Sequence, residues 1–355
     1  MDTKIKLKKF WKNKKVFITG HTGFKGSWMS ILLNMLEADI YGYSLKPDIK
    51  SLFNQAKCKK FIKNNFYGNV NYSKALEDKI IKSKPDILFH LAAQPLVSQS
   101  FTDPLETLHT NIIGTANVLN AARKVSSLKS IVIITTDKVY KIKDSNKSYN
   151  ELDELGGKDP YSGSKVCAEI VTNLYIESFF KTKNIKNIIS TARSGNVIGG
   201  GDYSKNRLLP DILKCINSKK KLIIRNPKNI RPWQHVIEPL LGYLKLAELQ
   251  YKKKVSNKNP AWNFGPNRKS FVKVSDILKI IQKKSTIKFE IKRNKNFFET
   301  NILKLSNTKA KKILNWYPIW DLQKSIDSVM EWNNQIKKGK DPKKICENQI
   351  NDYLK

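Results

Sequence analysis

The sequence has few cysteines, and their spacing excludes two common stabilising devices. The four cysteines, Cys58, Cys167, Cys215 and Cys346, lie far apart and form no C-x-x-C pair. This pattern favours neither a zinc site nor a disulfide framework, and it agrees with a reducing compartment. We therefore expect no metal centre.

Long apolar runs are also missing. No run reaches the roughly 18 residues that a membrane-spanning helix needs. The first residues, MDTKIKLKKFWKNKK, contain no apolar stretch of the kind that directs export. We therefore expect a cytoplasmic protein with no membrane segment.

Acidic residues are scarce relative to basic ones. Asp and Glu total 30 against 66 Lys and Arg, which gives a formal net charge of +36. Such a charge suggests nucleic-acid binding. However, the lysines are spread along the whole chain, and no zinc finger, ribonucleoprotein-type aromatic motif or recognition helix is present. We expect no specific nucleic-acid binding, although a positive field attracts small anionic substrates.

The chain is long enough for a large core. Its 355 residues are 40% hydrophobic, which excludes a disordered chain. At about 150 residues per domain, this length corresponds to roughly two domains. No internal repeat is visible.

The first strong motif is a strand, a glycine-rich turn and a helix. The run 15–20, KVFITG, is rich in β-forming residues and leads into Gly20-His21-Thr22-Gly23-Phe24-Lys25-Gly26 and an apolar helical segment over 27–36. Glycines let a backbone turn tightly and approach a pyrophosphate, whose charge meets the helix N-terminus. This motif predicts a dinucleotide-binding loop, in which His21 and Lys25 add positive charge near the phosphates.

The second predicted strand, 39–44, lacks a feature common in NAD-binding folds. An acidic residue usually closes this strand and holds the ribose hydroxyls. Here the chain reads Ser44-Leu45-Lys46. Because Lys46 is compatible with a 2′-phosphate, this segment does not decide between NAD and NADP.

Strands and helices then alternate. We predict strands over 65–70, 86–91, 129–136 and 188–194, and helices over 73–82 and 107–125. This alternation predicts parallel βαβ units and an α/β fold with a doubly wound, Rossmann-type parallel sheet. Ligands of such sheets bind at the carboxyl ends of the strands, where the polar residues of this sequence gather.

The regular alternation ends near residue 195. We predict a Rossmann domain over 1–195 and, over 196–355, a smaller α/β lobe that mainly binds substrate. Later helices are expected over 210–217, 236–250, 274–284 and 322–337. The segment 261–264 reads as a strand that returns to the large sheet.

A tyrosine and a lysine lie four residues apart in the segment Asp159–Lys165, DPYSGSK. If a helix begins near Pro160, Tyr161 and Lys165 share one helical face. A nearby ammonium stabilises phenolate and lowers the pKa of a tyrosine, which makes it a base near neutral pH. Alone, the Y-x-x-x-K spacing is a weak signal that a solvated helix face also explains.

Taken together, the motifs resemble the extended short-chain dehydrogenase/reductase family that modifies nucleotide sugars. Within it, the resemblance is strongest to the 4,6-dehydratases that act on CDP-glucose. The segments that carry it are ITGHTGFKGSW (18–28), HLAAQPLV (90–97), TTDKVY (135–140), ELDELGGKDPYSGSKVCAE (151–169), GNVIGGGD (195–202) and RPWQHV (231–236). They span about 220 residues.

The resemblance implies a reaction and catalytic roles. The family oxidises the hexose 4-hydroxyl with bound NAD, eliminates water across C5 and C6, and returns the hydride to C6. Tyr161 is then the base for the 4-hydroxyl and Thr136 its hydrogen-bond partner, while Lys165 holds the nicotinamide ribose. Asp137 is the acid for the leaving 6-hydroxyl, and Lys138 is the base at C5. Asp137 needs a raised pKa and Lys138 a lowered one, so desolvation must outweigh their mutual attraction.

The resemblance also implies binding residues. Asn196, Arg207, Arg231 and His235 are expected to bind the nucleotide-sugar substrate. Other roles remain possible for three residues of this region. Asn196 is alternatively a simple turn residue and His235 a core residue, and Trp233 is either a core residue or one that stacks on the base. The predicted NAD-binding set is Gly20, His21, Thr22, Gly23, Phe24, Lys25, Gly26, Ser44, Asn69, Val70, Leu91, Ala92, Ala93, Gln94, Asn111, Tyr161 and Lys165.

One departure from the family pattern concerns the adenine site. Relatives commonly carry an acidic residue after the third strand, where this chain has Asn69 following Gly68. This change and the missing acid at Ser44 predict loose NAD binding.

Two functional alternatives stay open. The same fold serves epimerases and simple dehydrogenases, which normally lack the Asp137-Lys138 pair. The second alternative is a binding or regulatory protein that keeps the fold without turnover. The presence of Thr136, Tyr161 and Lys165 together argues against it. The family implies a homodimer through helices near 105–124 and 161–180, and a role in deoxysugar biosynthesis such as that of lipopolysaccharide O-antigens.

Overall fold

The computed structural model describes residues 3–143, 146–181, 188–218, 220–292 and 300–355. Its centre is a seven-stranded parallel sheet in the order β10-β6-β5-β4-β1-β2-β3. The strands of this sheet are β1 (Lys15–Thr19), β2 (Asp39–Ser44), β3 (Asn64–Tyr67), β4 (Ile87–His90), β5 (Ser130–Ile134), β6 (Ile188–Ser194) and β10 (Ala261–Phe264).

The inner strands are apolar because both faces of the sheet are covered. Every residue of β4 and β5 is buried, and β1 is buried from Val16 onward. Such continuous apolar runs are typical of parallel sheets packed between two helical layers. The direction of winding reverses between β1 and β4, and a crevice at such a point is where doubly wound folds bind ligands.

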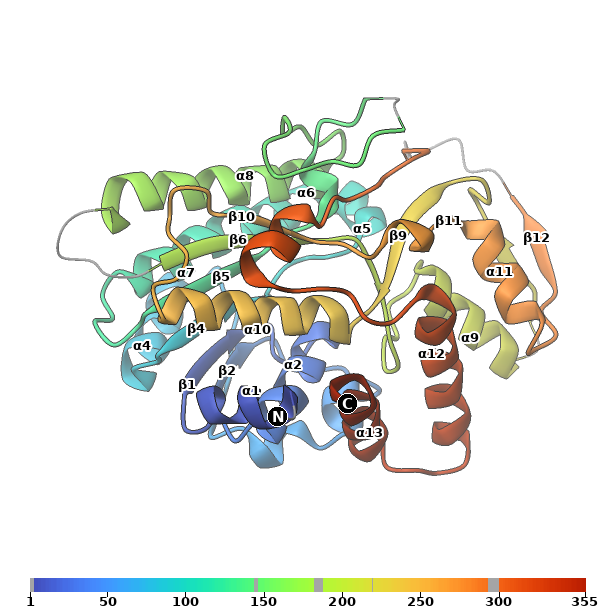
Figure 1. Cartoon of the computed structure of the whole chain (residues 1–355), viewed down its shortest axis with the longest axis horizontal. Helices are drawn as coiled ribbons and strands as arrows, with labels where there is room; N and C mark the ends of the chain where they lie inside the picture. Colours follow the sequence, from blue (N-terminus) through green and yellow to red (C-terminus); the bar gives the residue numbers. More distant parts are fainter. Residues whose placement is uncertain (1–2, 144–145, 182–187, 219, 293–299) are drawn as a thin grey trace.

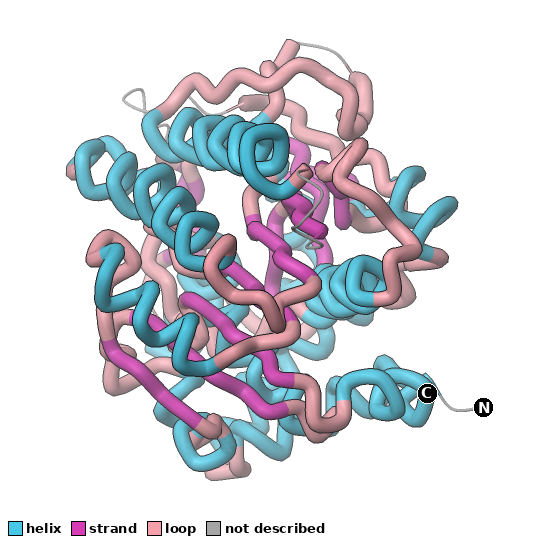
Figure 2. The backbone as a smooth tube through the Cα atoms, turned by 90° about the vertical axis from the view of Figure 1, so that its left-hand side faces the viewer, coloured by secondary structure: helices cyan, strands magenta, loops and turns pink. Residues whose placement is uncertain are grey.

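Helices cover the two faces of this sheet (Figures 1 and 2). One core cluster includes residues of α1 (Thr3–Trp11), α2 (Phe24–Met35), α10 (Ile237–Tyr251) and α13 (Pro342–Leu354). The cluster on the opposite face includes residues of α4 (Ser73–Ser83) and α7 (Gly114–Ala122). It also includes residues of η4 (Ile176–Phe180), the turn that ends the long helix α8 (Pro160–Tyr175). Short helices α3 (Leu52–Gln55) and η1 (Cys58–Phe61) follow β2.

The predicted helix over 107–125 is an interrupted one. It consists of α6 (Pro104–Leu108), the π-helical turn η2 (His109–Ile113) and α7, and a further helix, α5 (Val97–Thr102), precedes it. Helix α8 (Pro160–Tyr175) likewise continues into a π-helical turn, η4 (Ile176–Phe180). Single π turns inside helices are frequent at functional sites, and η2 carries Asn111.

A second lobe lies beside the carboxyl edge of the large sheet (Figure 1). It contains a three-stranded sheet in the order β11-β9-β7 and a two-stranded sheet, β12-β8. The elements of this lobe are β7 (Asn196–Ile198), α9 (Leu208–Ser218), β8 (Leu222–Ile224), β9 (Ile230–His235), β11 (Phe271–Lys273), α11 (Val274–Gln282), β12 (Phe289–Ile291) and α12 (Leu322–Lys337). The remaining elements are two short 3-10 helices, η3 (Asp137–Val139) and η5 (Arg268–Ser270), and a π-helical turn, η6 (Ala310–Leu314).

The C-terminal half of the chain contributes to both bodies. Strand β10 pairs in parallel with β6, with Ala261 opposite Thr191 and Phe264 opposite Ser194. Helices α10 and α13 also pack in the core of the large sheet. A domain boundary near residue 195 stays a prediction, and these three elements lie with the large sheet although they follow that residue.

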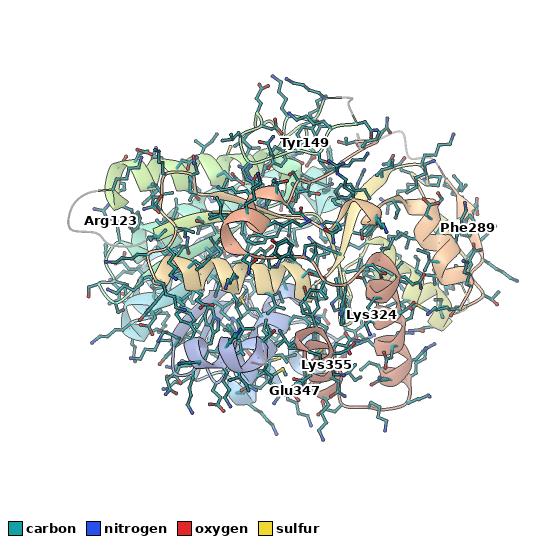
Figure 3. All side chains as sticks on the ribbon, viewed as in Figure 1. Arg123, Tyr149, Phe289, Lys324, Glu347 and Lys355 are labelled. Carbon is teal, nitrogen blue, oxygen red and sulfur yellow. The ribbon has the colours of Figure 1, made fainter. Side chains whose placement is uncertain are left out.

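The last two helices are joined by an ion pair at the surface. Lys324 on α12 (Figure 3) lies 2.6 Å from Asp352 on α13.

Among the described residues, no helix is both long and apolar enough to cross a membrane.

Candidate active site

A cavity of about 810 Å³ opens along the carboxyl edge of the large sheet and extends under the second lobe. Loops that follow β1, β2, β4, β5 and β6 line one side. Residues of β7, α9, β8 and β9 line the other side. Both bodies of the chain therefore contribute to one binding space.

The glycine loop after β1 forms one end of this cavity. Gly20 has a φ of +76°, and a Cβ there would lie 2.6 Å from the Ala92 backbone nitrogen. A Cβ at Gly26 would lie 2.1 Å from the Gly20 carbonyl oxygen. Helix α2 begins just after Gly23, with no side chain capping it. The loop thus presents bare backbone and a helix N-terminus to the cavity, as phosphate binding requires.

His21 does not have the role that its place in this loop suggests. Its side chain is fully buried, does not line the cavity, and places Nε2 2.7 Å from Asn65 Oδ1. Burial lowers the pKa of His21 to about 4. The prediction that His21 adds positive charge near the phosphates is therefore wrong, because the imidazole is neutral at neutral pH and faces Gly42 inside the sheet.

Ser44 and Asn69 lie at the next part of the cavity, after β2 and β3. The Ser44 hydroxyl lies 2.7 Å from Thr22 Oγ1, which in turn donates to the Leu45 carbonyl oxygen. Asn69 Oδ1 accepts a hydrogen bond from the Asn71 backbone at 2.9 Å. Both side chains are therefore held by neighbouring segments, and no carboxylate stands at either position.

The loop after β4 passes along the cavity floor. Leu91, Ala92, Ala93 and Gln94 all line the cavity. Asn111 does not line it, contrary to its predicted contact with the cofactor. Instead its buried amide donates to Gln94 O at 3.1 Å and to Ser164 Oγ at 2.9 Å. Asn111 therefore holds this loop against α8.

Thr136, Asp137 and Lys138 follow β5 and face the cavity together. Thr136 caps the short turn η3: its Oγ1 accepts from Lys138 N and donates to Asp137 Oδ1 at 3.1 Å. Asp137 is 2% exposed. Burial raises the pKa of its carboxyl above the usual value and outweighs the opposing charge of Lys138. The expectation that desolvation dominates at Asp137 is confirmed.

Tyr161 and Lys165 lie on the first turns of α8 and both line the cavity. Asp159 caps this helix by accepting from Ser162 N at 2.9 Å, and Pro160 occupies its first position. The expected lowering of the Tyr161 pKa is wrong for this structure. Burial raises the pKa of Tyr161 to about 12, while Lys165 Nζ donates to the Ile134 carbonyl oxygen at 3.3 Å.

Of these two groups, Lys165 is the one whose pKa lies nearer to neutral pH. Burial lowers the pKa of its ammonium to about 8, and the carboxylate of Glu169 opposes this shift. A cavity that removes water from both groups favours their neutral forms. This is why spacing along the helix alone gave the wrong sign for Tyr161.

One amide and two positive side chains face the cavity from the second lobe. Asn196, Arg207 and Arg231 all line it, as predicted. Arg207 Nη1 lies 3.1 Å from Asp202 Oδ2, and Arg231 is buried in β9 with Nη1 donating to Ile230 O at 2.9 Å. Guanidinium groups of this kind suit a diphosphate.

His235 is a core residue and does not line the cavity, so its predicted substrate contact is wrong. Its ring lies between those of Trp28 and Trp320, with centroid distances of 5.6 and 4.9 Å. Burial lowers its pKa to about 3. Trp233 is 4% exposed in the core of the second lobe, as one of its two alternatives has it, and it also lines the cavity, while base stacking stays a prediction.

The geometry of this site can be compared with that of known proteins. A family model described as GDP-mannose 4,6 dehydratase matches residues 17–329. The chain belongs to this family. As a GDP-mannose 4,6-dehydratase family member it is an extended short-chain dehydrogenase/reductase.

Curated members of the family include well-matched relatives. The CDP-glucose 4,6-dehydratase of Salmonella typhimurium is 38% identical over 98% of this chain and 98% of its own length. The dTDP-D-glucose 4,6-dehydratase of Homo sapiens is 25% identical over 90% of this chain and 89% of its own length.

Solved structures show the same fold at low sequence identity. MoeE5 in complex with UDP-glucose and NAD is 18% identical, with a TM-score of 0.77 over 91% of this chain and 99% of its own. The dTDP-glucose 4,6-dehydratase of Bacillus anthracis in complex with NAD is 20% identical, with a TM-score of 0.74 over 92% and 99%.

Several residues in or beside the cavity are absent from the predicted set of site residues. Ser194 and Gly195 line the cavity at the end of β6, and their place after a predicted strand was an available signal. Arg225 also lines it and donates to Asn206 Oδ1 at 2.7 Å. Tyr243, whose hydroxyl donates to Ser194 Oγ at 2.9 Å, comes from the buried helix α10 and gave no sequence signal.

Proposed function

We propose that this chain is an NAD-dependent CDP-glucose 4,6-dehydratase, a hydro-lyase that forms CDP-4-dehydro-6-deoxy-D-glucose. One observation supports this reaction class most directly. A buried carboxyl with a raised pKa, Asp137, and the side-chain amino group of Lys138 face the same cavity as Tyr161. Elimination of water needs such an acid and base together.

The cavity fits NAD. Gly20, Gly23 and Gly26 line the cavity without side chains, and no side chain caps the N-terminus of α2, so peptide N–H groups are available there to a pyrophosphate. Gly20, Thr22, Gly23, Phe24 and Gly26 would hold the pyrophosphate, whereas the Lys25 ammonium, predicted to lie near the phosphates, donates instead to Ser194 Oγ. Ser44, Asn69 and Val70 would hold the adenosine. Leu91 to Gln94, Tyr161 and Lys165 would surround the nicotinamide ribose. NAD held in this way would supply the hydride acceptor for oxidation at C4 and the hydride donor for reduction at C6.

Tyr161 accepts the proton of the sugar 4-hydroxyl, and Thr136 hydrogen-bonds the same oxygen. Because burial holds the Tyr161 pKa near 12, this transfer needs positive charge beside the phenol. Arg207 lowers the Tyr161 pKa from across the cavity. Lys165, one helical turn along α8, is the second positive group on this side.

The ketone formed at C4 acidifies the proton on C5. Lys138 takes that proton while Asp137 gives its own proton to the 6-hydroxyl, so that the C6–O bond breaks and water leaves. The resulting C5–C6 double bond accepts a hydride at C6 and a proton from Lys138 at C5. The net change is the loss of one water molecule. Asp137 must start protonated, and its burial favours that state.

The identity of the nucleotide is supported by the relatives. Asn196, Arg207 and Arg231 would hold a diphosphate, which every nucleotide diphosphate sugar carries. The choice of cytidine is supported by the CDP-glucose 4,6-dehydratase of Salmonella, which matches this chain over nearly its whole length. Another nucleotide-sugar dehydratase or an epimerase of the same family is the alternative.

The test is to incubate the purified protein with CDP-glucose, with and without NAD, and to follow the alkaline absorbance of a 4-keto-6-deoxy sugar. We expect product with CDP-glucose and greater turnover when NAD is added. Product from dTDP-, UDP- or GDP-sugars but not from CDP-glucose would overturn the nucleotide assignment. Epimerised sugar without loss of water would overturn the dehydratase assignment.

We also infer a homodimer through α6 to α7 and α8. Large apolar side chains are exposed along these helices: Leu105 is 70%, Ile113 45%, Ile170 55% and Leu174 54% exposed. Exposed apolar patches on neighbouring helices are typical of protein interfaces. We expect the enzyme to act in the cytoplasm and to supply deoxysugar pathways such as that of lipopolysaccharide O-antigens.

A further inference from the structure

Lys25 reaches a different part of the site from the one its sequence position suggests. It lies in the glycine loop at the start of α2, yet its Nζ donates to Ser194 Oγ at 2.8 Å, at the end of β6. Ser194 is 3% exposed and also accepts from Tyr243 Oη at 2.9 Å. The lysine therefore spans the site from the cofactor loop to the strand beside the catalytic turn.

The carboxyl group of Asp137 lies against the next residue of the same segment. A Cβ on Gly195 would lie 2.9 Å from Asp137 Oδ2. Within the described part of the chain, this oxygen is buried and has no hydrogen-bond partner. Lys25 therefore contacts Ser194, and Asp137 lies against Gly195, the next residue in the chain.

These two groups face a mixed set of charges. Arg207 and Lys165 disfavour the charged form of Lys25, whereas Asp137 and Asp202 favour it. Burial is the largest effect and lowers the pKa of Lys25 to about 7. The largest effects on Asp137 besides burial come from Lys138, Thr136, Arg231 and Lys25, and Asp137 is also coupled to Tyr161 and Tyr243, whose pKa values it raises. Lys25 is therefore a charge beside Asp137 that itself changes near neutral pH.

We propose that Lys25 is a positioning residue for the elimination step, which it influences by setting the protonation of Asp137 across the Ser194–Gly195 segment. This inference rests on the proposed function, in which Asp137 delivers a proton to the leaving hydroxyl. When Lys25 is charged it favours the carboxylate, and when it is neutral it favours the protonated acid. As pH rises through the range where Lys25 loses its proton, Asp137 is helped to keep its own. Compared with a permanent positive charge at position 25, a lysine that loses its proton therefore extends to higher pH the range in which Asp137 is protonated.

A matched pair of variants separates this role from a structural one. Lys25→Met removes the charge, so the Asp137 pKa should rise and the basic limb of the pH profile of kcat should move to higher pH. Lys25→Arg keeps a permanent charge, so the same limb should move to lower pH. Each shift should be roughly one pH unit or less, since a neighbouring charge moves a carboxyl pKa by about 1–3 units and the Ser194–Gly195 segment lies between the two groups. A loss of packing or of the Ser194 hydrogen bond would not shift the basic limb of the pH profile in opposite directions in the two variants.

The profiles are measured with saturating CDP-glucose and NAD, because changes at the glycine loop also affect cofactor affinity. Lys9→Met, which removes the charge of an exposed lysine on α1, is the control and should leave the profile unmoved. Thermal unfolding checks that each variant is folded. Equal profiles for the wild type and both Lys25 variants would overturn the proposal, as would shifts in the same direction.

A second readout does not depend on turnover. In protein labelled with ¹³C at the aspartate carboxyl carbon, the Asp137 signal is identified by its loss in Asp137→Asn and titrated without ligands. Its midpoint should rise in Lys25→Met and fall in Lys25→Arg. An unmoved midpoint would overturn the proposal even if the enzyme is an active dehydratase. If the wild type forms no product from any nucleotide sugar, the proposed function fails, and this titration still decides whether Lys25 governs Asp137.

Discussion

Arg193 Nε donates to Glu169 Oε1 at 2.7 Å, and the two side chains form an ion pair that is almost fully buried. The pair joins the end of β6 to α8. The Thr135 hydroxyl donates to the same carboxylate at 2.7 Å, and the Tyr140 hydroxyl accepts from Arg193 at 2.8 Å. Glu169 also favours the charged form of Lys165. The helix that carries Tyr161 and Lys165 is thus fixed by a charge pair that does not line the cavity.

Breaking this pair should be costly, and removing both charges less so. Glu169→Leu or Arg193→Met alone leaves a buried charge without its partner and should lower the free energy of unfolding by about 3–5 kcal/mol. The double variant should lose clearly less than the sum of the two single losses. Urea unfolding of the four proteins measures this coupling. Additive losses would show that the pair is not energetically linked.

Asp137→Asn should separate oxidation from water loss. The amide cannot donate a carboxyl proton, so formation of the 4-keto-6-deoxy sugar should fall by about 10²–10⁴-fold, while oxidation at C4, followed by nicotinamide absorbance, should persist. Asp78→Asn, on the exposed side of α4, is the control for loss of one carboxylate. Dehydration at the wild-type rate in Asp137→Asn would remove this residue from the mechanism.

Glu238 gives a prediction for stability against pH. This fully buried carboxyl on α10 accepts hydrogen bonds from Trp320 N at 2.7 Å and Ile319 N at 3.0 Å, and it contacts Tyr353 of α13. Burial raises its pKa from 4.5 to about 7. Between these values the folded state binds more protons than the unfolded state, so stability falls as pH rises.

The shift corresponds to about 3 kcal/mol, present below pH 4.5 and lost by about pH 7. Glu238→Gln cannot ionise, so its stability relative to the wild type should increase across this range. Unfolding by urea at pH 4.5, 6 and 7.5 measures the difference. A difference that does not change with pH would contradict the raised pKa.

Two glycines of the cofactor loop should respond differently to alanine. At Gly26 the new methyl would lie 2.1 Å from the Gly20 carbonyl oxygen, whereas at Gly23 it would lie 3.4 Å from the same atom, an ordinary contact. Gly26→Ala should therefore lower stability by about 1–3 kcal/mol or more and weaken NAD binding. Gly23→Ala should fold with nearly wild-type stability. Thermal unfolding and titration with NAD compare them, and equal stability of the two variants would contradict the predicted close approach at Gly26.

The association of two chains can be tested at α8. Ile170 is 55% exposed on this helix, and a charge there would be buried in the inferred interface at high cost. Ile170→Glu should convert a dimer to a monomer in light-scattering measurements. Ile313→Glu, at a 54% exposed position on η6, should leave the assembly unchanged. A monomeric wild type, or a dimer that tolerates Ile170→Glu, would contradict this interface.

Much of the fold could be predicted because local patterns carry it. The buried strands β1, β4 and β5 are mainly apolar, whereas β6 is buried but also carries polar residues, and each was expected within a few residues of its observed bounds. The start of α8 follows from Asp159 and Pro160. By contrast, the helix over 107–125 was predicted without its π turn, since the hydrogen bonds of Asn111 to Gln94 and Ser164 are tertiary contacts.

The sequence by itself determined the order of the elements, the glycine loop and the chemical groups after β5 and on α8, because turn residues, apolar periodicity and motif spacing act between near neighbours. Only the tertiary structure decided which of those groups reach the cavity and in what charge state. His21 and His235 are turned into the core, and Lys25 crosses to Ser194. The pKa values of Tyr161 and Asp137 are set chiefly by loss of water around them. Burial is a property of the whole packed chain, and so the spacing of residues along the sequence could not supply it.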